Sequence, residues 1–281
     1  MKKIDKQVQT YLEWGEKVQN CTRQTAAHRE YSIKRFVRDT QVRRIEDVTN
    51  PIVDDWIANM VNAGIGGATI NGYLRFVVAM MRRFDEQGVV ARKFDPKLVK
   101  KVKCSPTKRV FFTEDQIKQV LSVSDDFQWL LISLCFRCGF RITELTELRL
   151  DNIDGRRITF IGKGRKIREV WISEEIETRL TVWIAARRAT DWLWENPQRP
   201  GTHYSTQWVR ISMRRAFQKA GISGFHPHAL RHSFATNICA KGAPLPIAQR
   251  MLGHSRITTT ELYVHSFDGR LEEFFDKYSL A

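Results

Sequence analysis

The residues of this chain best suited to chemistry stand in "HPHALRHSF", residues 226–234, which holds three histidines and one arginine. No helix breaker occurs over residues 229–240, so His228 and Arg231 should project from one face of a single helix. A guanidinium offers planar, paired donors that fit the oxygens of a phosphate group. The stretch therefore indicates phosphate chemistry, although histidines on such a helix are more often structural, as we expect for His232.

A second group of candidates lies further on, in "MLGHSRITTTELYVH". Gly253 is expected to end a helix, with His254 directly behind it. Thr258 and Glu261 then form a capping box for a short helix that carries Tyr263. Most tyrosines bury their rings and hydrogen-bond their hydroxyls, so Tyr263 gains a chemical meaning only from its place behind the other motifs.

The charge of the chain points to a polyanionic partner. Its 281 residues include 46 Lys and Arg against 31 Asp and Glu, a formal net charge of +15. Such an excess favours nucleic acid, the other interpretation being a generally basic soluble protein. No run of about 18 apolar residues could span a bilayer, and the opening residues, "MKKIDKQVQT", lack the apolar core of a secretory signal. We expect a cytoplasmic, DNA-associated protein with no membrane partner.

The five cysteines are scattered and odd in number, which argues against a disulfide framework. Cys135 and Cys138 form a CxxC pair, but they stand in the apolar helical run "LLISLCFRCGF" without a second ligand pair. We expect both thiols in the core rather than at a zinc or redox site. The sequence thus predicts no metal site and no cofactor.

Length and periodicity predict two domains joined by a basic linker. Residues 1–96 show apolar side chains at three- and four-residue spacing and predict a bundle of helices. Residues 97–109, "KLVKKVKCSPTKR", contain no acid and indicate an extended linker, either lying along phosphates or solvated as a plain tether. Residues 110–281 form the second domain.

The second domain is predicted to be mostly helical with one small antiparallel sheet. Thr113 and Gln116 form a capping box at its start, and a helix is expected over "RITELTELRL" from about Arg141. The alternating segments of "RRITFIGKGRKIREVWI" predict a hairpin with Lys163 at or near its tip. The fold class is therefore mainly α, a helical bundle followed by a mixed, mostly helical domain.

The order of these motifs resembles one enzyme family. "FRITEL", "GKG", "HALRH", "LGH" and a tyrosine nine residues beyond His254 follow one another as in the tyrosine recombinases, or phage integrases. The resemblance covers the whole second domain, and the first is similar to the core-binding domain of the two-domain, Xer-like or Cre-like members. It implies a metal- and ATP-independent enzyme that cleaves, exchanges and religates DNA strands at a specific core site, in integration, excision or resolution.

The residue types implied by the resemblance suit that chemistry. In-line attack on a phosphodiester adds roughly one negative charge at phosphorus, which cationic donors stabilise. A tyrosine hydroxyl, with an ordinary pKa near 10, needs a nearby base, and a lysine can protonate the leaving 5′ oxygen. The assigned residues are Tyr263 as the nucleophile, Arg141 and Arg231 as phosphate clamps, Lys163 as the general acid, His228 as a proton-transfer or orienting partner, His254 as a further phosphate ligand and Glu144 as a supporting acid.

Weaker predictions concern assembly and DNA contacts. "LEEFFDKYSLA" places apolar side chains on one face of a helix from about residue 268, which packs either on its own domain or on a neighbouring protomer. The family's habit favours exchange of that helix within a homotetramer on two DNA duplexes. Some residues of the first domain and linker are expected to contact DNA, although most such side chains are merely solvated: Arg23, Lys34, Asn71, Arg75 and Lys108.

Two other functions are compatible with the motifs. A type IB topoisomerase shares the phosphotyrosine chemistry but relaxes DNA as a monomer, and a non-catalytic DNA-binding module could retain the fold. The tail helix and the "HALRH" pattern favour recombination. Strand-transfer products at a specific sequence would separate recombination from relaxation of any supercoiled plasmid, and a Tyr263→Phe variant that keeps its function would indicate the binding module.

Overall fold

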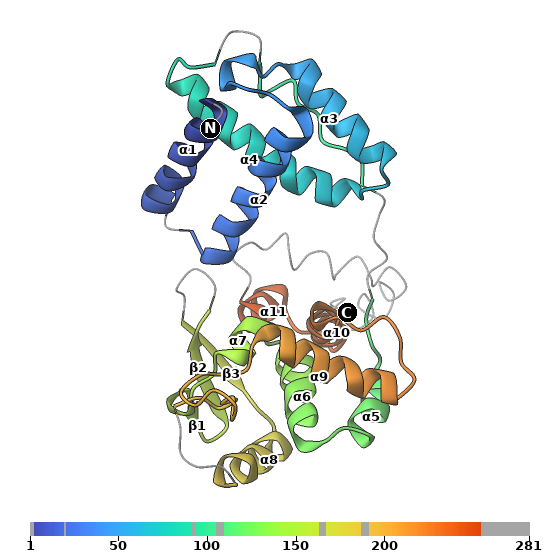
Figure 1. Ribbon diagram of the computed structural model, residues 1–281. Helices are drawn as coiled ribbons and strands as arrows, with labels where there is room; N and C mark the ends of the chain where they lie inside the picture. The colour runs from blue at the N-terminus through green and yellow to red at the C-terminus, as the bar shows by residue number, and fades with distance from the viewer. Residues whose placement is uncertain are drawn as a thin grey trace, which may run out of the picture. The chain divides into compact units, whose positions relative to one another are not determined.

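Two compact units make up the molecule, as a computed structural model of the chain shows (Figure 1). One unit runs to Thr107 and the other begins at Lys108. Each surrounds an apolar core of its own, as independent domains do. The structure describes residues 3–19, 21–90, 94–104, 110–162, 167–186 and 191–253.

The first unit, within its described residues, is a bundle of four α-helices with one 3-10 turn. The helices are α1 (Lys3–Gln19), α2 (Arg23–Thr40), α3 (Asn50–Asn62) and α4 (Gly67–Glu86), with η1 (Ile45–Asp47) between α2 and α3. Threonine side chains start two of them: Thr22 Oγ1 accepts from the Thr25 N–H, and Thr49 Oγ1 from the Ile52 N–H. The amphipathic spacing in this part of the sequence therefore predicted the helices correctly.

The core of the first unit forms where α2, α3 and α4 turn their apolar faces inward. Phe36 of α2 and Trp56 of α3 meet edge to face with ring centroids 5.0 Å apart. Both rings are buried together with Met80 and Met81 of α4. Burial of such large side chains is the main term that stabilises a bundle of this size.

Residues 94–104, which include most of the predicted linker, pack on the first unit. Val102 donates its N–H to Asn71 Oδ1 and accepts from Asn71 Nδ2, each at 2.9 Å. A Cβ at Gly67 would lie 2.9 Å from the Lys103 carbonyl oxygen, so the close approach of this segment to α4 needs a glycine. The lysines of the segment all remain exposed: Lys97, Lys100, Lys101 and Lys103.

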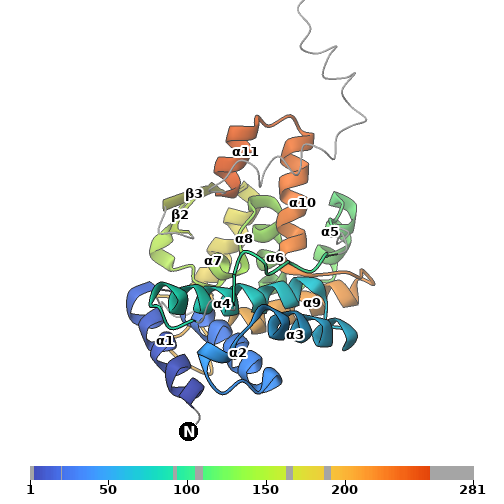
Figure 2. The same cartoon turned by 90° about the horizontal axis from the view of Figure 1, so that it is seen from above.

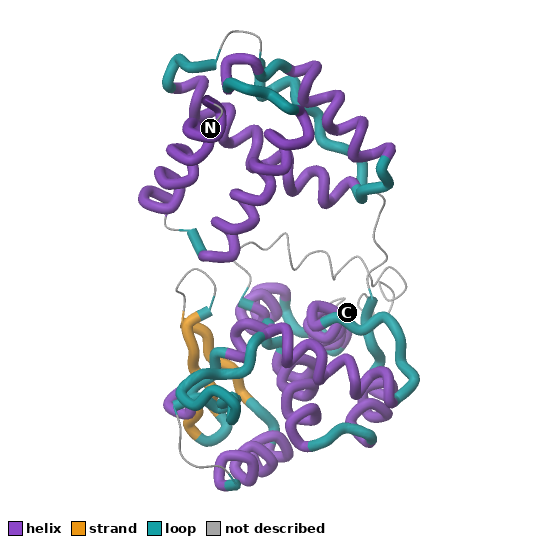
Figure 3. The backbone as a smooth tube through the Cα atoms, in the orientation of Figure 1, coloured by secondary structure: helices purple, strands orange, loops and turns teal. Residues whose placement is uncertain are grey.

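The second unit is mostly helical, with a small sheet along one side (Figure 3). Its elements are α5 (Glu114–Ser122), α6 (Asp126–Cys138), α7 (Ile142–Thr146), η2 (Leu150–Asn152), β1 (Ile153–Asp154), β2 (Arg157–Ile161), β3 (Ile167–Trp171), α8 (Glu174–Ala185), α9 (Thr206–Lys219), α10 (Pro227–Ala240) and α11 (Leu245–Leu252). Thr113 starts α5 with the capping box predicted from its sequence, and Asp125 starts α6 in the same way.

The sheet contains the predicted hairpin, which is confirmed. Its strands lie in the order β1-β2-β3, with both pairs antiparallel, and the register sets Phe160 opposite Arg168 and Ile161 opposite Ile167. Successive side chains alternate between the buried and the exposed face, as a pleated strand requires. The predicted fold class is thereby confirmed, while Lys163 and the rest of the turn, 163–166, lie outside the described residues.

One helix is much shorter than its sequence predicted. The pattern of "RITELTELRL" favours a helix through residue 150, but α7 ends at Thr146. Backbone pairing explains the early end: the Leu193 N–H donates to the Leu148 carbonyl at 3.0 Å, and the Leu150 N–H donates to the Asp191 carbonyl at 3.1 Å. These long-range bonds satisfy backbone groups that a continued helix would have used locally.

Helix α6 is the centre of the second unit. It packs against α8, α9 and α10, and α11 packs in turn against α10 (Figure 2). Cys135 and Cys138 are buried within α6, as predicted, and burial raises the pKa of each thiol to about 12. The thiols therefore stay protonated near neutral pH and act as small apolar side chains. No helix in the described part of the chain is long and apolar enough to cross a bilayer.

Candidate active site

The three histidines of "HPHALRH" have different environments. His226 is the N-cap of α10, where its Nδ1 accepts from the Ala229 N–H at 3.1 Å. Pro227 follows in the first turn, a position that suits proline because no N–H is needed there. His228 is then exposed on the first turn of α10, and His232 lies one turn further along and is half-buried. His226 is also exposed, but its Nδ1 is engaged as a cap, whereas His228 is an exposed imidazole close to it on the helix.

Arg231 projects from α10 into the interior of the second unit. It is 5% exposed, and its Nη1 donates to the Gly139 carbonyl at 2.5 Å. Its Nη2 donates to the Leu252 carbonyl, at the end of α11. The apolar face of the same helix, which includes Leu230 and Phe234, is buried as its spacing predicted. A guanidinium so deep in a protein is held by its acceptors in one orientation.

Arg141 reaches the end of α11 from the tight turn that follows α6. Gly139 ends α6 with φ 67°, and a Cβ there would lie 2.4 Å from the Phe234 ring, so this turn requires glycine. Two residues later Arg141 stands at the N-cap of α7, where its Nη1 contacts Glu144 Oε1 at 2.5 Å. Its Nη2 donates to the Gly253 carbonyl at 3.2 Å. The short α7 thus positions Arg141 against the carboxylate one turn ahead.

Glu144 is the shared acceptor of this cluster. The carboxylate is 7% exposed and accepts from the Arg141 backbone N–H at 2.9 Å. Its Oε2 also accepts from Arg168 Nη1 at 2.6 Å, while Arg231 Nη1 lies 3.9 Å away. Three guanidiniums therefore surround one carboxylate, an excess of positive charge that suits an anionic ligand.

The three arginines all donate to backbone carbonyls at the end of α11. The carbonyls of three successive residues accept one each: Met251 from Arg168 at 2.5 Å, Leu252 from Arg231, and Gly253 from Arg141. Gly253 takes the left-handed conformation at φ 59°, as the predicted helix end requires. The carbonyl end of a helix carries partial negative charge, so cations bind it favourably. Residues 90 positions apart in the sequence, Arg141 and Arg231, meet at this helix end.

The sequence of the second unit matches the model of the phage integrase family over residues 110–270. The chain belongs to the phage integrase family. It is 30% identical over 219 residues to the "Tyrosine recombinase XerC" of Lactobacillus delbrueckii subsp. bulgaricus, a match that covers 72% of this chain and 73% of the relative. It is 26% identical to the "Tyrosine recombinase XerA" of Pyrococcus horikoshii, over 96% of this chain and 92% of that one.

Solved structures of related enzymes share the fold of this integrase. A lambda integrase dimer bound to a COC′ core site aligns with a TM-score of 0.78 at 16% identity, over 94% of this chain and 96% of that one. The XerH site-specific recombinase, in a post-cleavage complex with a palindromic difH substrate, aligns with a TM-score of 0.75 at 21% identity, over 92% and 81%. The predicted family is confirmed, and the chain is a tyrosine recombinase, an enzyme of site-specific DNA recombination.

His228 of this integrase has a lower pKa than an ordinary histidine. Although His228 is exposed to solvent, the protein around it partly desolvates the imidazole and lowers its pKa below the ordinary 6.5, and the cations Arg231 and Arg141 lower it further. Burial also lowers the pKa of His226. His228 is therefore uncharged at neutral pH and has a lone pair that can accept a proton.

This lowered pKa predicts how stability depends on pH. Below about pH 6.5 the unfolded chain binds protons that folded His228 does not, so the free energy of unfolding should fall from there toward the folded-state pKa and then level off. Urea unfolding from pH 5 to 7.5 should show a smaller fall for His228→Gln than for the unaltered chain. An NMR titration should give His228 a midpoint below 6.5; a midpoint at or above that value would contradict the assignment.

Sequence reasoning missed Arg168, which contacts Glu144 and the end of α11. Its sequence signal is a charged residue at an inward position of an alternating strand, between Ile167 and Glu169 of β3, both exposed. It also missed the exposed basic side of α9, "TQWVRISMRRAFQK", which contains no acid. Arg210 of that helix is close enough to His228 to lower the pKa of its imidazole.

Several predicted site residues lie outside the described part of the chain. They are the general acid Lys163, the phosphate ligand His254, the nucleophile Tyr263, the linker residue Lys108 and the tail helix from about residue 268. The described chain ends at Gly253, whose carbonyl binds Arg141. The next residue is His254, so the described cluster borders directly on the predicted remainder of the site.

The residues predicted to contact DNA in the first unit differ in their surroundings. Arg23, Lys34 and Arg75 are exposed, with Lys34 paired to Glu30 at 2.5 Å. The guanidinium of Arg75 lies over the Phe76 ring, 4.5 Å from its centroid. Asn71 is engaged within its own unit, because its amide makes the two hydrogen bonds to Val102. Three of the four described candidates are thus accessible to a ligand.

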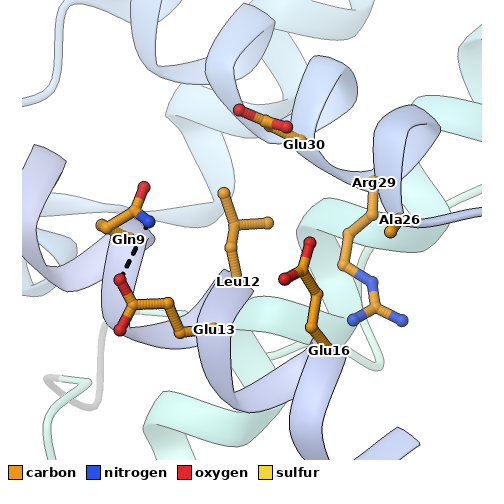
Figure 4. Close-up of a pocket in the computed structure, with 7 residues that line it drawn as sticks. All are labelled: Gln9, Leu12, Glu13, Glu16, Ala26, Arg29 and Glu30. Atoms are coloured by element: carbon orange, nitrogen blue, oxygen red, sulfur yellow. Dashed lines mark hydrogen bonds between the residues drawn. The ribbon is translucent and has the colours of Figure 1, made fainter. Parts of the chain in front are cut away.

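A small cavity between α1 and α2 has an acidic lining. Figure 4 shows Glu13 and Glu16 of α1 and Glu30 of α2 around the opening, with Arg29 at its side and Gln9 bonded to Glu13 at 2.9 Å. Its volume is about 60 Å³, room for little more than a few water molecules. Three carboxylates would repel a phosphate backbone, so this opening is unsuited to DNA.

Proposed function

We propose that this integrase cleaves and rejoins DNA strands at a specific core site through a 3′-phosphotyrosyl bond at Tyr263. The convergence of Arg141 and Arg231 on one carboxylate and one helix end supports this proposal most directly. This convergence brings two guanidiniums, each with paired donors, side by side. From Gly253, at that helix end, the chain continues into His254 and, nine residues later, Tyr263. No observation favours a type IB topoisomerase or a non-catalytic module.

Arg141 and Arg231 are the proposed clamps of the scissile phosphate. Each guanidinium has five N–H donors, so a phosphate oxygen can bind alongside the carbonyls that each already contacts. The excess positive charge around Glu144 stabilises a phosphorane that carries about one more negative charge than the phosphodiester. His254 adds a further donor to a non-bridging oxygen.

Protons and bonds balance in the proposed step. The Tyr263 oxygen forms a bond to phosphorus as the bond from phosphorus to the 5′ oxygen breaks. His228, uncharged at neutral pH, accepts the phenolic proton, directly or through water, and Lys163 donates a proton to the leaving 5′ oxygen. The product ester keeps the energy of the phosphodiester, so rejoining by an incoming 5′-hydroxyl requires neither ATP nor a metal ion.

Basic surfaces on both units are the proposed DNA contacts. We assign residues 1–96 to a core-binding domain, 97–109 to a linker and 110–281 to the catalytic domain. The exposed lysines of residues 97–103 suit non-specific phosphate contacts, as do Arg23, Lys34, Arg75 and Lys108. In the catalytic domain Arg210 and Arg214 lie one turn apart on the exposed side of α9, and Arg210 is near His228. Asn71 contacts DNA only if its bonds to Val102 open.

Assembly is the remaining part of the proposal. Four protomers acting on two duplexes of cytoplasmic DNA would exchange strands in pairs, and the tail helix from about residue 268 would pack on a neighbouring protomer. Related recombinases support DNA as the partner, since one solved structure is a dimer on a core site and another is a post-cleavage complex with its substrate. Exchange of the tail would make cleavage depend on assembly.

The proposed function is tested by trapping the covalent intermediate. The chain is incubated with a library of nicked duplexes in which the fragment beyond the cut diffuses away and leaves the enzyme attached. After nuclease digestion, mass spectrometry should find a nucleotide on the peptide that contains Tyr263, and sequencing of the trapped DNA should reveal one core site. A nucleotide on another residue, or none on any duplex, would contradict the proposal.

A further inference from the structure

We infer that Arg168 is a positioning residue of the DNA-cleaving reaction, which neutralises Glu144 and anchors the end of α11 so that Arg141 and Arg231 stay available to the phosphate. This role rests on the proposed function, because it concerns the two proposed phosphate clamps. Arg168 acts through Glu144 and the α11 backbone, and it has no place in the chemical steps themselves.

The contacts of Arg168 are almost all internal to the cluster. Its side chain is 5% exposed, and Nη1 donates to Glu144 Oε2 at 2.6 Å. Its Nη2 donates to the Met251 carbonyl at 2.5 Å and to the Gly139 carbonyl at 3.2 Å. The guanidinium also lies 5.5 Å from the centroid of the Phe160 ring, on the neighbouring strand. One side chain therefore connects the sheet, the turn after α6, the carboxylate and the end of α11.

Arg168 lies closer to one oxygen of the buried Glu144 carboxylate than the clamp Arg231 does. Glu144 Oε2 is 2.6 Å from Arg168 but 3.9 Å from Arg231, so Arg168 is the side chain that neutralises this oxygen. Without Arg168, Arg141 would still contact Oε1 at 2.5 Å, but Oε2 would lose its close cation, and a buried charge that is incompletely compensated is unfavourable. If Arg168 were removed, Oε2 would attract Arg231, the next cation, and compete with the phosphate for it.

Arg168 also anchors the end of α11 without taking part in the proposed phosphate contacts. The Leu252 and Gly253 carbonyls are bound by Arg231 and Arg141, which must also bind the substrate. Only the Met251 carbonyl, among these three, is bound by an arginine that has no proposed phosphate contact. Arg168 can therefore hold the helix end, and the chain leading to His254, while the clamps adjust to a changing phosphorus geometry.

The test uses Arg168→Met, whose unbranched apolar side chain suits the space beside Phe140 and Phe160. At saturating nicked duplex the single-turnover cleavage rate should fall about 100-fold, the scale of a clamp displaced by about 1 Å, while the Kd for that duplex changes less than about threefold. Hydrogen exchange of the amides of α11 should become at least about tenfold faster. Arg157→Met is the matched control: this arginine of the same sheet is exposed and pairs with Asp154 on the surface, and its loss should alter neither readout.

A second substitution distinguishes charge balance from mere packing. Glu144→Gln should slow cleavage in the unaltered chain, because it removes the negative charge and one of the two acceptor oxygens that hold Arg141 and Arg168. Added to Arg168→Met, the same change should raise the rate about tenfold, because no charged carboxylate oxygen that lacks a close cation then attracts Arg231 away from the phosphate. A double variant no faster than Arg168→Met would mean that Arg168 only fills space, and would overturn the inference.

Other outcomes are equally decisive. Arg168→Met at the rate of the unaltered chain overturns the inference, and so does unchanged exchange of α11. If Arg168→Met does not fold, Arg168→Lys replaces it: lysine keeps the charge but lacks the paired Nη1 and Nη2 that bind Glu144 and the Met251 carbonyl, so a rate within twofold of the unaltered chain would refute the role. Absence of any adduct from the unaltered chain would refute the proposed function instead, and the exchange of α11 would still test the anchor.

Discussion

Replacing Tyr263 with phenylalanine should abolish covalent attachment to DNA and lower the cleavage rate by about 10⁴-fold or more, the scale on which loss of a nucleophile acts. Phenylalanine keeps the ring and removes only the oxygen that would bond to phosphorus. The clamps Arg141 and Arg231 are untouched, so the Kd for the core duplex should stay within about threefold of its unaltered value. The adduct is measured by denaturing gels on the nicked duplex, and binding by gel shift.

Tyr204→Phe is the control for this prediction. Tyr204 lies in the second unit with its ring stacked on Trp208, centroids 3.9 Å apart, and a phenylalanine preserves that stack. It should cleave at the unaltered rate. Adduct formation by Tyr263→Phe would show that another residue is the nucleophile, and retained recombination without adduct would indicate a different mechanism.

Replacing Glu144 with leucine should cause the largest loss of stability among single changes in the active-site cluster. Leucine is apolar and removes the only carboxylate that contacts Arg141 and Arg168 among the described residues. Arg168 would then be a buried cation without a counter-ion, and removing one partner of a buried pair costs about 3–5 kcal/mol. Urea unfolding should show a free energy of unfolding lowered by that amount, and cleavage should fall about 100-fold as the clamps lose their acceptor.

An exposed pair of equal length gives the control for Glu144→Leu. Arg137 and Glu175 are also 2.5 Å apart, but their side chains are 35% and 52% exposed. Glu175→Leu should change the free energy of unfolding by less than about 1 kcal/mol, because water and salt already screen that pair. Equal losses for the two variants would show that burial of the cluster does not determine its contribution.

Much of the fold was readable from local patterns. Amphipathic spacing predicted α1 to α4, the capping box at Thr113 predicted the start of α5, and alternation around residues 157–171 predicted the hairpin. These features depend on neighbours in the chain, which is why sequence reveals them. The helix predicted over "RITELTELRL" was too long. Its last residues form backbone hydrogen bonds with residues 191–193, and no local sequence pattern reveals such a long-range contact.

The candidate site was likewise predictable from the sequence only in part. "FRITEL", "HALRH", "LGH" and the tyrosine beyond them identified the family and named Arg141, His228 and Arg231, because the spacing of such groups on one helix or loop is a local property. Which acceptor holds each arginine is a property of the folded core alone. Arg168 looked like one more basic residue of a basic chain, yet folding buries it against Glu144 and Met251, residues far from it in sequence. Burial turns an ordinary surface charge into a group that must be neutralised, and only packing decides where burial occurs.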